Sequence, residues 1–154
     1  MRIDIKLLND RAKLPERMTE YSAGYDIYAD LESDVWLEPL DRVLVPTGFS
    51  LSLPKGFEAQ IRPRSGLSMK HGVTVLNSPG TIDSDYRGEV KVILINLSNE
   101  RYLIKSGMRI AQMVVSRHET LEFVVIDNLD TTDRGEGGFG SSETQCFAQF
   151  TNDN

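Results

Sequence analysis

Short apolar runs, each followed by a turn former, are the feature that most limits how this chain can fold. Each run is too short for a typical helix but long enough for a strand. The runs are residues 35–37, 43–46, 49–53 and 57–61. Proline or glycine separates each run from the next, and both residues interrupt regular structure. This spacing predicts an all-β sandwich or barrel.

The rest of the chain continues this pattern. Residues 2–8 alternate between apolar and charged side chains, which predicts a half-buried strand. Residues 90–97 carry the apolar run 92–95, which predicts a strand buried on both faces, the second face covered by another copy of the chain. Further strands are expected at residues 23–29, 102–104, 109–115 and 121–126. Only residues 65–71 are typical of a helix, which Gly72 can end.

Composition excludes several classes of function. The 154-residue chain has a formal net charge of −6, so it lacks the basic field that binds nucleic acid. Its single cysteine, Cys146, forms neither an internal disulfide nor a zinc cluster. No apolar run approaches the ~20 residues that span a bilayer, and the first six residues are too charged for a leader. We therefore expect a cytoplasmic protein without a membrane partner.

The segment NSPGTIDSDYRGE, residues 77–89, precedes the strand at 90–97. Residues 81–83 are expected to pair with that strand as a β-hairpin, with Asp83 and Tyr86 beside the turn. Unpaired backbone groups of a hairpin can bond the edge of a planar base. Asp83 is a carboxylate that can accept a proton from water. The alternative interpretation is that residues 83–85 only form the turn.

Three other segments carry polar groups in apolar surroundings. The segment PRSGLS, 63–68, places Arg64, Ser65 and Gly66 at the start of the predicted helix, where an anion is favoured. Gln112 lies in the strand RIAQMVV and suits a phosphate oxygen or a water, unless it faces solvent. Asp26 lies in AGYDIYA and needs a partner. It either bonds a neighbouring loop or supports the water shell of a metal. The two histidines are interpreted as structural.

The glycine-rich tail changes the character of the chain. Residues 1–130 are predicted to form a β-sheet domain, and residues 131–154 a flexible lid segment and tail. The segment RGEGGFGSS contains four glycines, and ordering its nine residues costs on the order of 10 kcal/mol of backbone entropy. Only a ligand with several charges and a flat face would offset this cost, such as a triphosphate for Arg134 and a base for Phe139. A flexible linker is the alternative.

In this order, the segments AGYDIYA, PRSGLS, NSPGTIDSDYRGE, RIAQM and RGEGGFGSS resemble the five motifs of the trimeric dUTPase family, from Ala23 to Ser142. The resemblance implies a jelly-roll-like β fold with one short helix, assembled as a homotrimer whose active sites are shared between subunits. It also implies hydrolysis of dUTP to dUMP and pyrophosphate with Mg²⁺. In the family this reaction limits uracil incorporation into DNA and supplies dUMP for dTMP synthesis.

The resemblance also implies roles for individual residues. Asp83 is the implied general base, Tyr86 packs on the deoxyribose, and Asn77 with the hairpin backbone bonds uracil. Asp26 is implied to reach Mg²⁺ through water, while the substrate phosphates hold the ion. The implied substrate-binding residues are Arg64, Ser65, Gly66, Asn77, Thr81, Ile82, Asp83, Tyr86, Lys91, Gln112, Arg134, Phe139, Gly140, Ser141 and Ser142.

One departure and two alternatives accompany this resemblance. The family commonly ends its tail motif Gly-Ser-Thr-Gly, whereas Glu143 follows Ser141 and Ser142 here and adds a negative charge. A dCTP deaminase shares the fold, but its chemistry needs a glutamate base and it has no glycine-rich lid. A nucleotide-responsive binding module, in which catalysis is secondary, is the alternative from another class.

Overall fold

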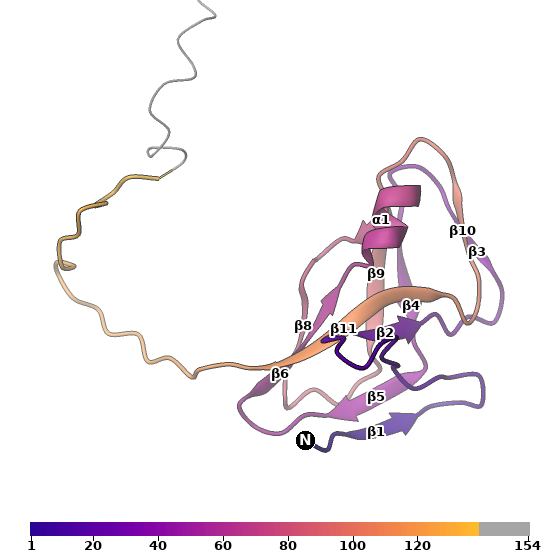
Figure 1. The fold of residues 1–154 in the computed structure, drawn as a ribbon, viewed down its shortest axis with the longest axis horizontal. Coiled ribbons are helices and arrows are strands. Elements are labelled where there is room, and N and C mark those ends of the chain that lie inside the picture. The colour runs from indigo at the N-terminus through magenta and orange to yellow at the C-terminus, as the bar shows by residue number, and fades with distance from the viewer. Residues whose placement is uncertain (139–154) are drawn as a thin grey trace, which may run out of the picture. The chain divides into compact units, whose positions relative to one another are not determined.

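The chain consists mostly of β-strands with one short helix (Figure 1). The computed structural model describes residues 1–138. Contacts divide the chain into Met1–Thr120 and Leu121–Asn154, and the named elements all lie in the first unit. They are β1 (Asp4–Leu7), β2 (Tyr25–Tyr28), β3 (Val35–Leu37), β4 (Arg42–Pro46), β5 (Phe49–Ser52), β6 (Phe57–Arg62), α1 (Ser65–His71), β7 (Val73–Val75), β8 (Gly80–Ile82), β9 (Lys91–Asn96), β10 (Tyr102–Ile104) and β11 (Arg109–Arg117).

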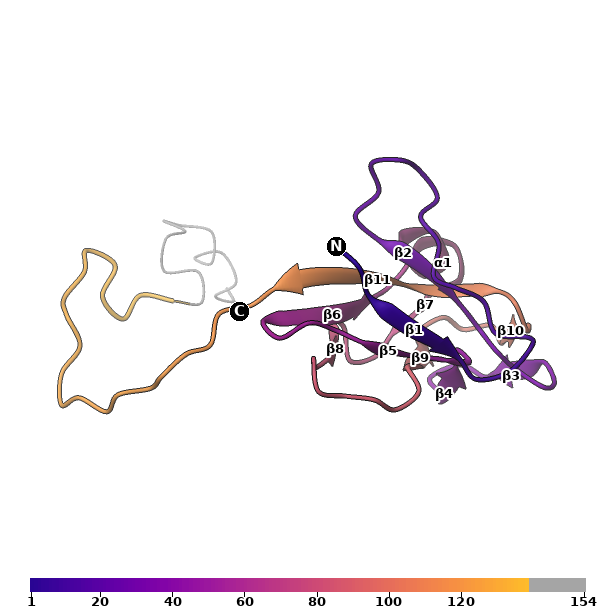
Figure 2. The ribbon, with the colours of Figure 1, turned by 90° about the horizontal axis from the view of Figure 1, so that it is seen from below.

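Four antiparallel sheets organise the first unit. The largest has the strand order β2-β11-β6-β8, and a second has the order β4-β9-β7. Strands β1 and β5 pair with each other, as do β3 and β10, and the β1-β5 pair is visible in both views (Figures 1 and 2). Side chains from several sheets form one core, in which Ile27, Phe49, Leu94 and Ile110 are almost fully buried. The predicted mostly β class with one helix is confirmed.

Helix α1 has the predicted bounds. Arg64 is its extended N-cap residue, and no side chain caps the first turn. Gly72 ends the helix in the left-handed region, with φ 65°, and its N–H bonds the carbonyl of Ser68. A Cβ on Gly72 would lie 2.9 Å from the backbone nitrogen of Ser98, so glycine is needed there for space as well as conformation. No helix among the described residues is long and apolar enough to cross a bilayer.

The predicted hairpin is wrong. Strand β8 pairs with β6, through Ala59↔Ile82 and Ile61↔Gly80, and not with β9. Both edges of β9 are already occupied, by β4 and by the short strand β7 that sequence reasoning missed. The segment between β8 and β9 therefore passes from one sheet to another. Strand β8 lies at the end of its sheet, so its outer edge still offers unpaired backbone groups.

Two further strand predictions also need correction. Strand β1 is exposed along its whole length and not half-buried, because it belongs to a sheet of only two strands. Residues 121–126 form no strand in the described part of the chain. Five of these six residues are nevertheless apolar, and Phe123 and Val125 are exposed. A strand needs a partner for its backbone groups, and the sequence pattern does not reveal whether one is available.

Candidate functional site

Asp26 lies between two arginines. Its Oδ1 is 3.3 Å from Nε of Arg64, and its Oδ2 accepts a hydrogen bond of 3.1 Å from Nη1 of Arg109. The backbone explains this meeting, because Asp26 on β2 faces Gln112 on the neighbouring β11 and Arg64 directly follows β6 on the other side of β11. The partner that a buried carboxylate requires is therefore a pair of guanidinium groups.

These arginines open into a cavity of about 320 Å³, called the cationic pocket below. Four of its lining residues are basic, and no acidic residue lines it among the described residues. Burial raises the pKa of the Tyr102 phenol and the nearby Arg64 charge lowers it, so the phenol stays neutral near pH 7. Such a pocket suits an anion with several charges. The lining residues are Arg64, Gly66, Leu67, Lys70, His71, Tyr102, Met108 and Arg109.

Gln112 lies near this pocket and is held from two sides. Its Nε2 donates a hydrogen bond of 3.0 Å to the carbonyl of Pro63, just before Arg64. A Cβ on Gly24 would lie 2.1 Å from Oε1 of Gln112, so only glycine leaves room for the amide. Gln112 does not simply face solvent, because its side chain is half-buried and bonded to the segment that carries Arg64.

A second cavity, of about 340 Å³, is called the Asp83 pocket below. It brings together six of the predicted substrate-binding residues, among them the exposed Asp83 and Tyr86. Sequence reasoning missed two others, Leu44 and Glu89. The lining residues are Leu44, Asn77, Thr81, Ile82, Asp83, Tyr86, Glu89 and Lys91. Polar groups around a small apolar surface suit a nucleoside better than a polyphosphate.

Hydrogen bonds fix the segment that carries Asp83 and Tyr86. Within it, Nη1 of Arg87 donates to the carbonyls of Ser84 and Tyr86. The Tyr86 hydroxyl donates to the carbonyl of Glu89 at 3.0 Å. Glu89 in turn anchors the segment, because Oε1 accepts from the N–H of Gly48 at 2.9 Å and Oε2 is 3.4 Å from Nζ of Lys91. The walls of the Asp83 pocket are therefore positioned before any ligand binds.

The two pockets share no lining residue. A single chain therefore presents the predicted phosphate-binding residues and the predicted nucleoside-binding residues as two separate sets. Ser65 is exposed at the first position of α1, beside the cationic pocket residue Arg64. Arg134 belongs to the second unit, where its Nε donates to the carbonyl of Gly137 at 2.8 Å. Phe139, Gly140, Ser141 and Ser142 lie outside the described residues.

The described residues do not form a metal cage. Nowhere in residues 1–138 do three or more His, Cys, Asp or Glu residues gather to hold a metal ion. Each oxygen of Asp26 faces a guanidinium, but an ionised carboxylate has about four lone-pair sites and can still accept from water. The chain thus fits Mg²⁺ only where most ligands come from elsewhere, such as phosphate oxygens.

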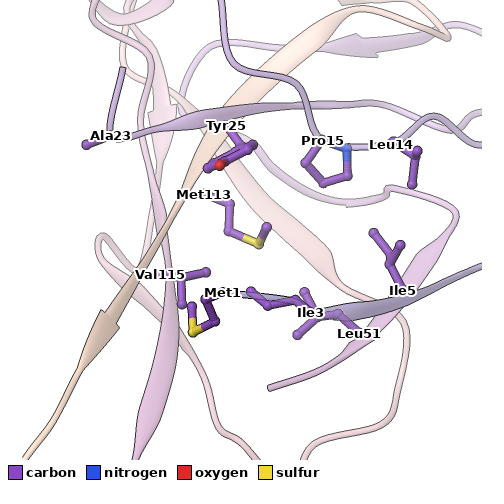
Figure 3. A pocket seen from close by; sticks show the side chains of 10 residues that line it. All are labelled: Met1, Ile3, Ile5, Leu14, Pro15, Ala23, Tyr25, Leu51, Met113 and Val115. Carbon is purple, nitrogen blue, oxygen red and sulfur yellow. The ribbon is translucent and has the colours of Figure 1, made fainter. Parts of the chain in front are cut away.

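An apolar cavity of about 410 Å³ lies elsewhere (Figure 3). Figure 3 shows its lining side chains, which include Ile3 from the segment before β1, Tyr25 from β2 and Met113 from β11. None of its lining side chains is charged. It therefore does not suit a phosphorylated compound.

The fold and the two polar pockets define a class: an all-β protein with a cationic pocket for a phosphorylated compound and a separate pocket that contains a carboxylate. The particular family follows from comparison with known proteins. The chain belongs to the dUTPase family, whose profile matches residues 10–143. Members of the family hydrolyse dUTP to dUMP and pyrophosphate and typically use Mg²⁺. The activity predicted from the motifs is confirmed, which decides against the deaminase alternative.

Similar proteins agree in sequence and structure. The deoxyuridine 5'-triphosphate nucleotidohydrolase of Fusobacterium nucleatum subsp. nucleatum is 51% identical over 90% of this chain and 96% of its own length. That of Finegoldia magna is 53% identical over 88% and 96%. The dUTPase of Staphylococcus bacteriophage 80alpha, solved with dUPNHPP, is 30% identical with a TM-score of 0.80, over 93% of this chain and 99% of that one.

Proposed function

We propose that this chain hydrolyses dUTP through attack of a water on the α-phosphorus, with the Asp83 carboxylate as the general base. The observation that carries the proposal is the Asp83 pocket, in which an exposed carboxylate lies beside Tyr86 and Asn77. A proton acceptor must lie within hydrogen-bond reach of the water that it activates. The hydrogen bonds that fix the segment between β8 and β9 support this assignment, because that segment carries Asp83.

Recognition of the base and the sugar is assigned to the same pocket. Asn77, Thr81 and Ile82 line it, and β8 contributes an unpaired edge, so backbone groups and an amide are available to bond uracil. The Tyr86 ring is assigned to the deoxyribose, where it leaves no space for a 2′-hydroxyl. A site whose polar groups are left unpaired by the wrong base rejects that base strongly.

The phosphates are assigned to the cationic pocket. Arg64 and Gly66 line it, Ser65 lies between them in the chain, and Gln112 is bonded to the segment that carries Arg64. Mg²⁺ is the proposed cofactor, held mainly by the phosphates, with water bound to Asp26 supporting it. When bound, the ion neutralises phosphate charge. Lys91 of the Asp83 pocket supplies a further cation on the nucleoside side.

A complete site needs both pockets, and we assign them to different copies in a jelly-roll-like homotrimer. Leu44 on β4 and its partner Ile93 on β9 support this, because they share a sheet face on which Leu44 is 55% exposed and Ile93 half-buried. Exposed apolar residues at 121–126 are a second surface that association would bury. Exposed apolar surface is favourable to bury against another chain, which supports the assignment.

The tail is assigned to a lid. Arg134 supplies a cation for the γ-phosphate, Phe139 a ring to stack on the base, and Gly140, Ser141 and Ser142 complete the closure. The cytoplasm is the proposed place of the reaction, because its substrate is a phosphorylated nucleotide.

A hydrolysis panel tests the proposal. The purified chain is incubated with dUTP, UTP, dTTP and dCTP, with and without Mg²⁺, and pyrophosphate and ammonia are measured. We expect pyrophosphate from dUTP in the presence of Mg²⁺ and no ammonia from dCTP. Binding of dUTP without release of pyrophosphate would favour the binding-module alternative.

A further inference from the structure

Arg109 lines the cationic pocket and begins the segment RIAQM, but the family resemblance assigns it no role. It is 41% exposed, lines the pocket beside Arg64, and contacts the buried Asp26. We propose that Arg109 is a positioning residue of the dUTPase reaction: by occupying one oxygen of Asp26, it prevents Asp26 from neutralising Arg64. The inference rests on the proposed function, because it takes the cationic pocket as the phosphate site.

One hydrogen bond and one ion pair divide the two oxygens of Asp26 between two cations. Nη1 of Arg109 donates to Oδ2 of Asp26 at 3.1 Å, and Nε of Arg64 is 3.3 Å from Oδ1. Nη1 of Arg109 also contacts Sδ of Met18 at 2.8 Å, which holds the guanidinium from its other side. Arg64 also contacts the backbone of Arg109, because Nη1 of Arg64 donates to the Arg109 carbonyl at 3.1 Å. Arg64 and Arg109 are therefore linked twice.

An irregularity in β11 makes this arrangement possible. On a regular strand, residues three apart point to opposite faces. Gln112 faces Asp26 across the β2–β11 pair, so Arg109 would point away from Asp26 if the strand were regular. The pairing shifts between Arg109 and Ala111, as at a β-bulge, and such a shift re-aims a side chain. The bulge thus brings the guanidinium of Arg109 to the same carboxylate.

The contacts of the two Asp26 oxygens determine how many N–H groups of Arg64 remain available to a phosphate. A carboxylate with both oxygens available pairs with a guanidinium through two parallel hydrogen bonds. With Oδ2 held by Arg109, Asp26 contacts Arg64 through one nitrogen, Nε. A guanidinium has five N–H donors, so most of those of Arg64 remain for phosphate. Without Arg109, Asp26 would turn both oxygens to Arg64 and withdraw it from the pocket.

The test is binding of inorganic pyrophosphate to the full chain in EDTA, measured by calorimetry, with the melting temperature of each variant recorded first. We expect Arg109→Gln to weaken binding about tenfold or more, since a charge-assisted contact is lost at Arg64. In an Asp26→Asn background the same change is expected to weaken binding less than about threefold, because no carboxylate remains to capture Arg64. The matched control is Arg117→Gln, an exposed arginine at the other end of β11.

Each outcome decides the inference. An Arg109→Gln effect no larger than that of Arg117→Gln overturns it. An equal loss in the wild-type and Asp26→Asn backgrounds also overturns it, because Arg109 would then bind phosphate directly. If Arg109→Gln lowers the melting temperature, Arg109→Met, which keeps the length of the side chain beside Met18, takes its place under the same criterion. Failure of the wild-type chain to hydrolyse dUTP would reject the proposed function, whereas pyrophosphate binding tests Arg109 independently.

Discussion

Replacement of Gly88 by alanine tests the proposal that Tyr86 selects the sugar. A Cβ on Gly88 would lie 2.3 Å from the hydroxyl oxygen of Tyr86 and 2.5 Å from Cζ of its ring. Gly88 does not adopt a left-handed conformation, so alanine causes no backbone strain there. The ring is 44% exposed and can move outward. Gly88→Ala is therefore expected to displace Tyr86 while the fold remains intact.

The expected decrease in kcat/KM follows from the overlap between the new Cβ at position 88 and the Tyr86 ring. Ordinary contact between these atoms begins near 3.4 Å, so the ring must retreat by roughly 1 Å. This displacement also breaks the bond of 3.0 Å between the Tyr86 hydroxyl and the Glu89 carbonyl. A misplacement of about 1 Å at a substrate-positioning group costs on the order of 100-fold in rate. We expect kcat/KM for dUTP to fall by about tenfold to 100-fold and kcat/KM for UTP to fall much less.

The assay compares kcat/KM for dUTP and UTP in wild type and Gly88→Ala, with the melting temperature as the measure of folding. Asp85→Ala is the matched control, because it changes the same loop but places no atom against the Tyr86 ring. We expect the ratio of kcat/KM for dUTP to kcat/KM for UTP to fall at least about tenfold in Gly88→Ala and to stay unchanged in Asp85→Ala. An unchanged ratio with a normally folded variant would refute the idea that the position of Tyr86 excludes the 2′-hydroxyl.

Three further predictions concern the base, the lid and the assembly. Asp83→Asn should bind a non-hydrolysable dUTP analogue nearly as wild type does but lower kcat by about 100-fold or more, because only the base is lost; an unchanged kcat would remove Asp83 from this role. Truncation before Arg134, or Phe139→Ala, should lower kcat/KM without changing the melting temperature by more than a few degrees. A large decrease in the melting temperature would instead place the tail in the core. Leu44→Asp should shift the sedimentation velocity from trimer to monomer, while Leu40→Asp, at another exposed leucine, should not; a trimeric Leu44→Asp would exclude this face as the interface.

Local patterns predicted most of the elements. Helix α1 begins after a proline-containing segment and ends at Gly72, and both limits depend on neighbouring residues alone. Strands such as β3 and β10 follow from short β-branched or aromatic runs between turn formers. Strand β7 was missed because Val73–Val75 follows the helix after the single residue Gly72, so no turn segment separates it from the helix.

Strand partners could not be predicted in this way. The hairpin of residues 81–83 with 90–97 was inferred because the two runs are close in sequence. The structure instead pairs β8 with β6, because both edges of β9 are already paired. The same limit explains residues 121–126, whose apolar pattern is typical of a strand but indicates no partner. Whether a strand has a free edge depends on the whole sheet and not on the apolar run that forms the strand.

In the candidate site, too, residues within one segment could be predicted, whereas contacts between distant segments could not. Six of the eight residues of the Asp83 pocket were predicted, and five of those six lie in one segment of the chain. Arg109 was not predicted, although it begins the segment RIAQM, because its importance depends on a bulge and on the two oxygens of Asp26. A basic residue at the start of a strand next to an expected buried acid is the signal that would have found it.

If the two pockets of one site come from different copies, as proposed, one damaged subunit can compensate for another. Asp83→Asn impairs only the Asp83 pocket, and Arg64→Gln only the cationic pocket. Neither variant alone can build an intact site. If each site takes one pocket from each of two copies, random exchange of the two variants in equal amounts leaves about a quarter of the sites with both halves undamaged. Revival of activity on mixing two inactive preparations would then report subunit exchange directly.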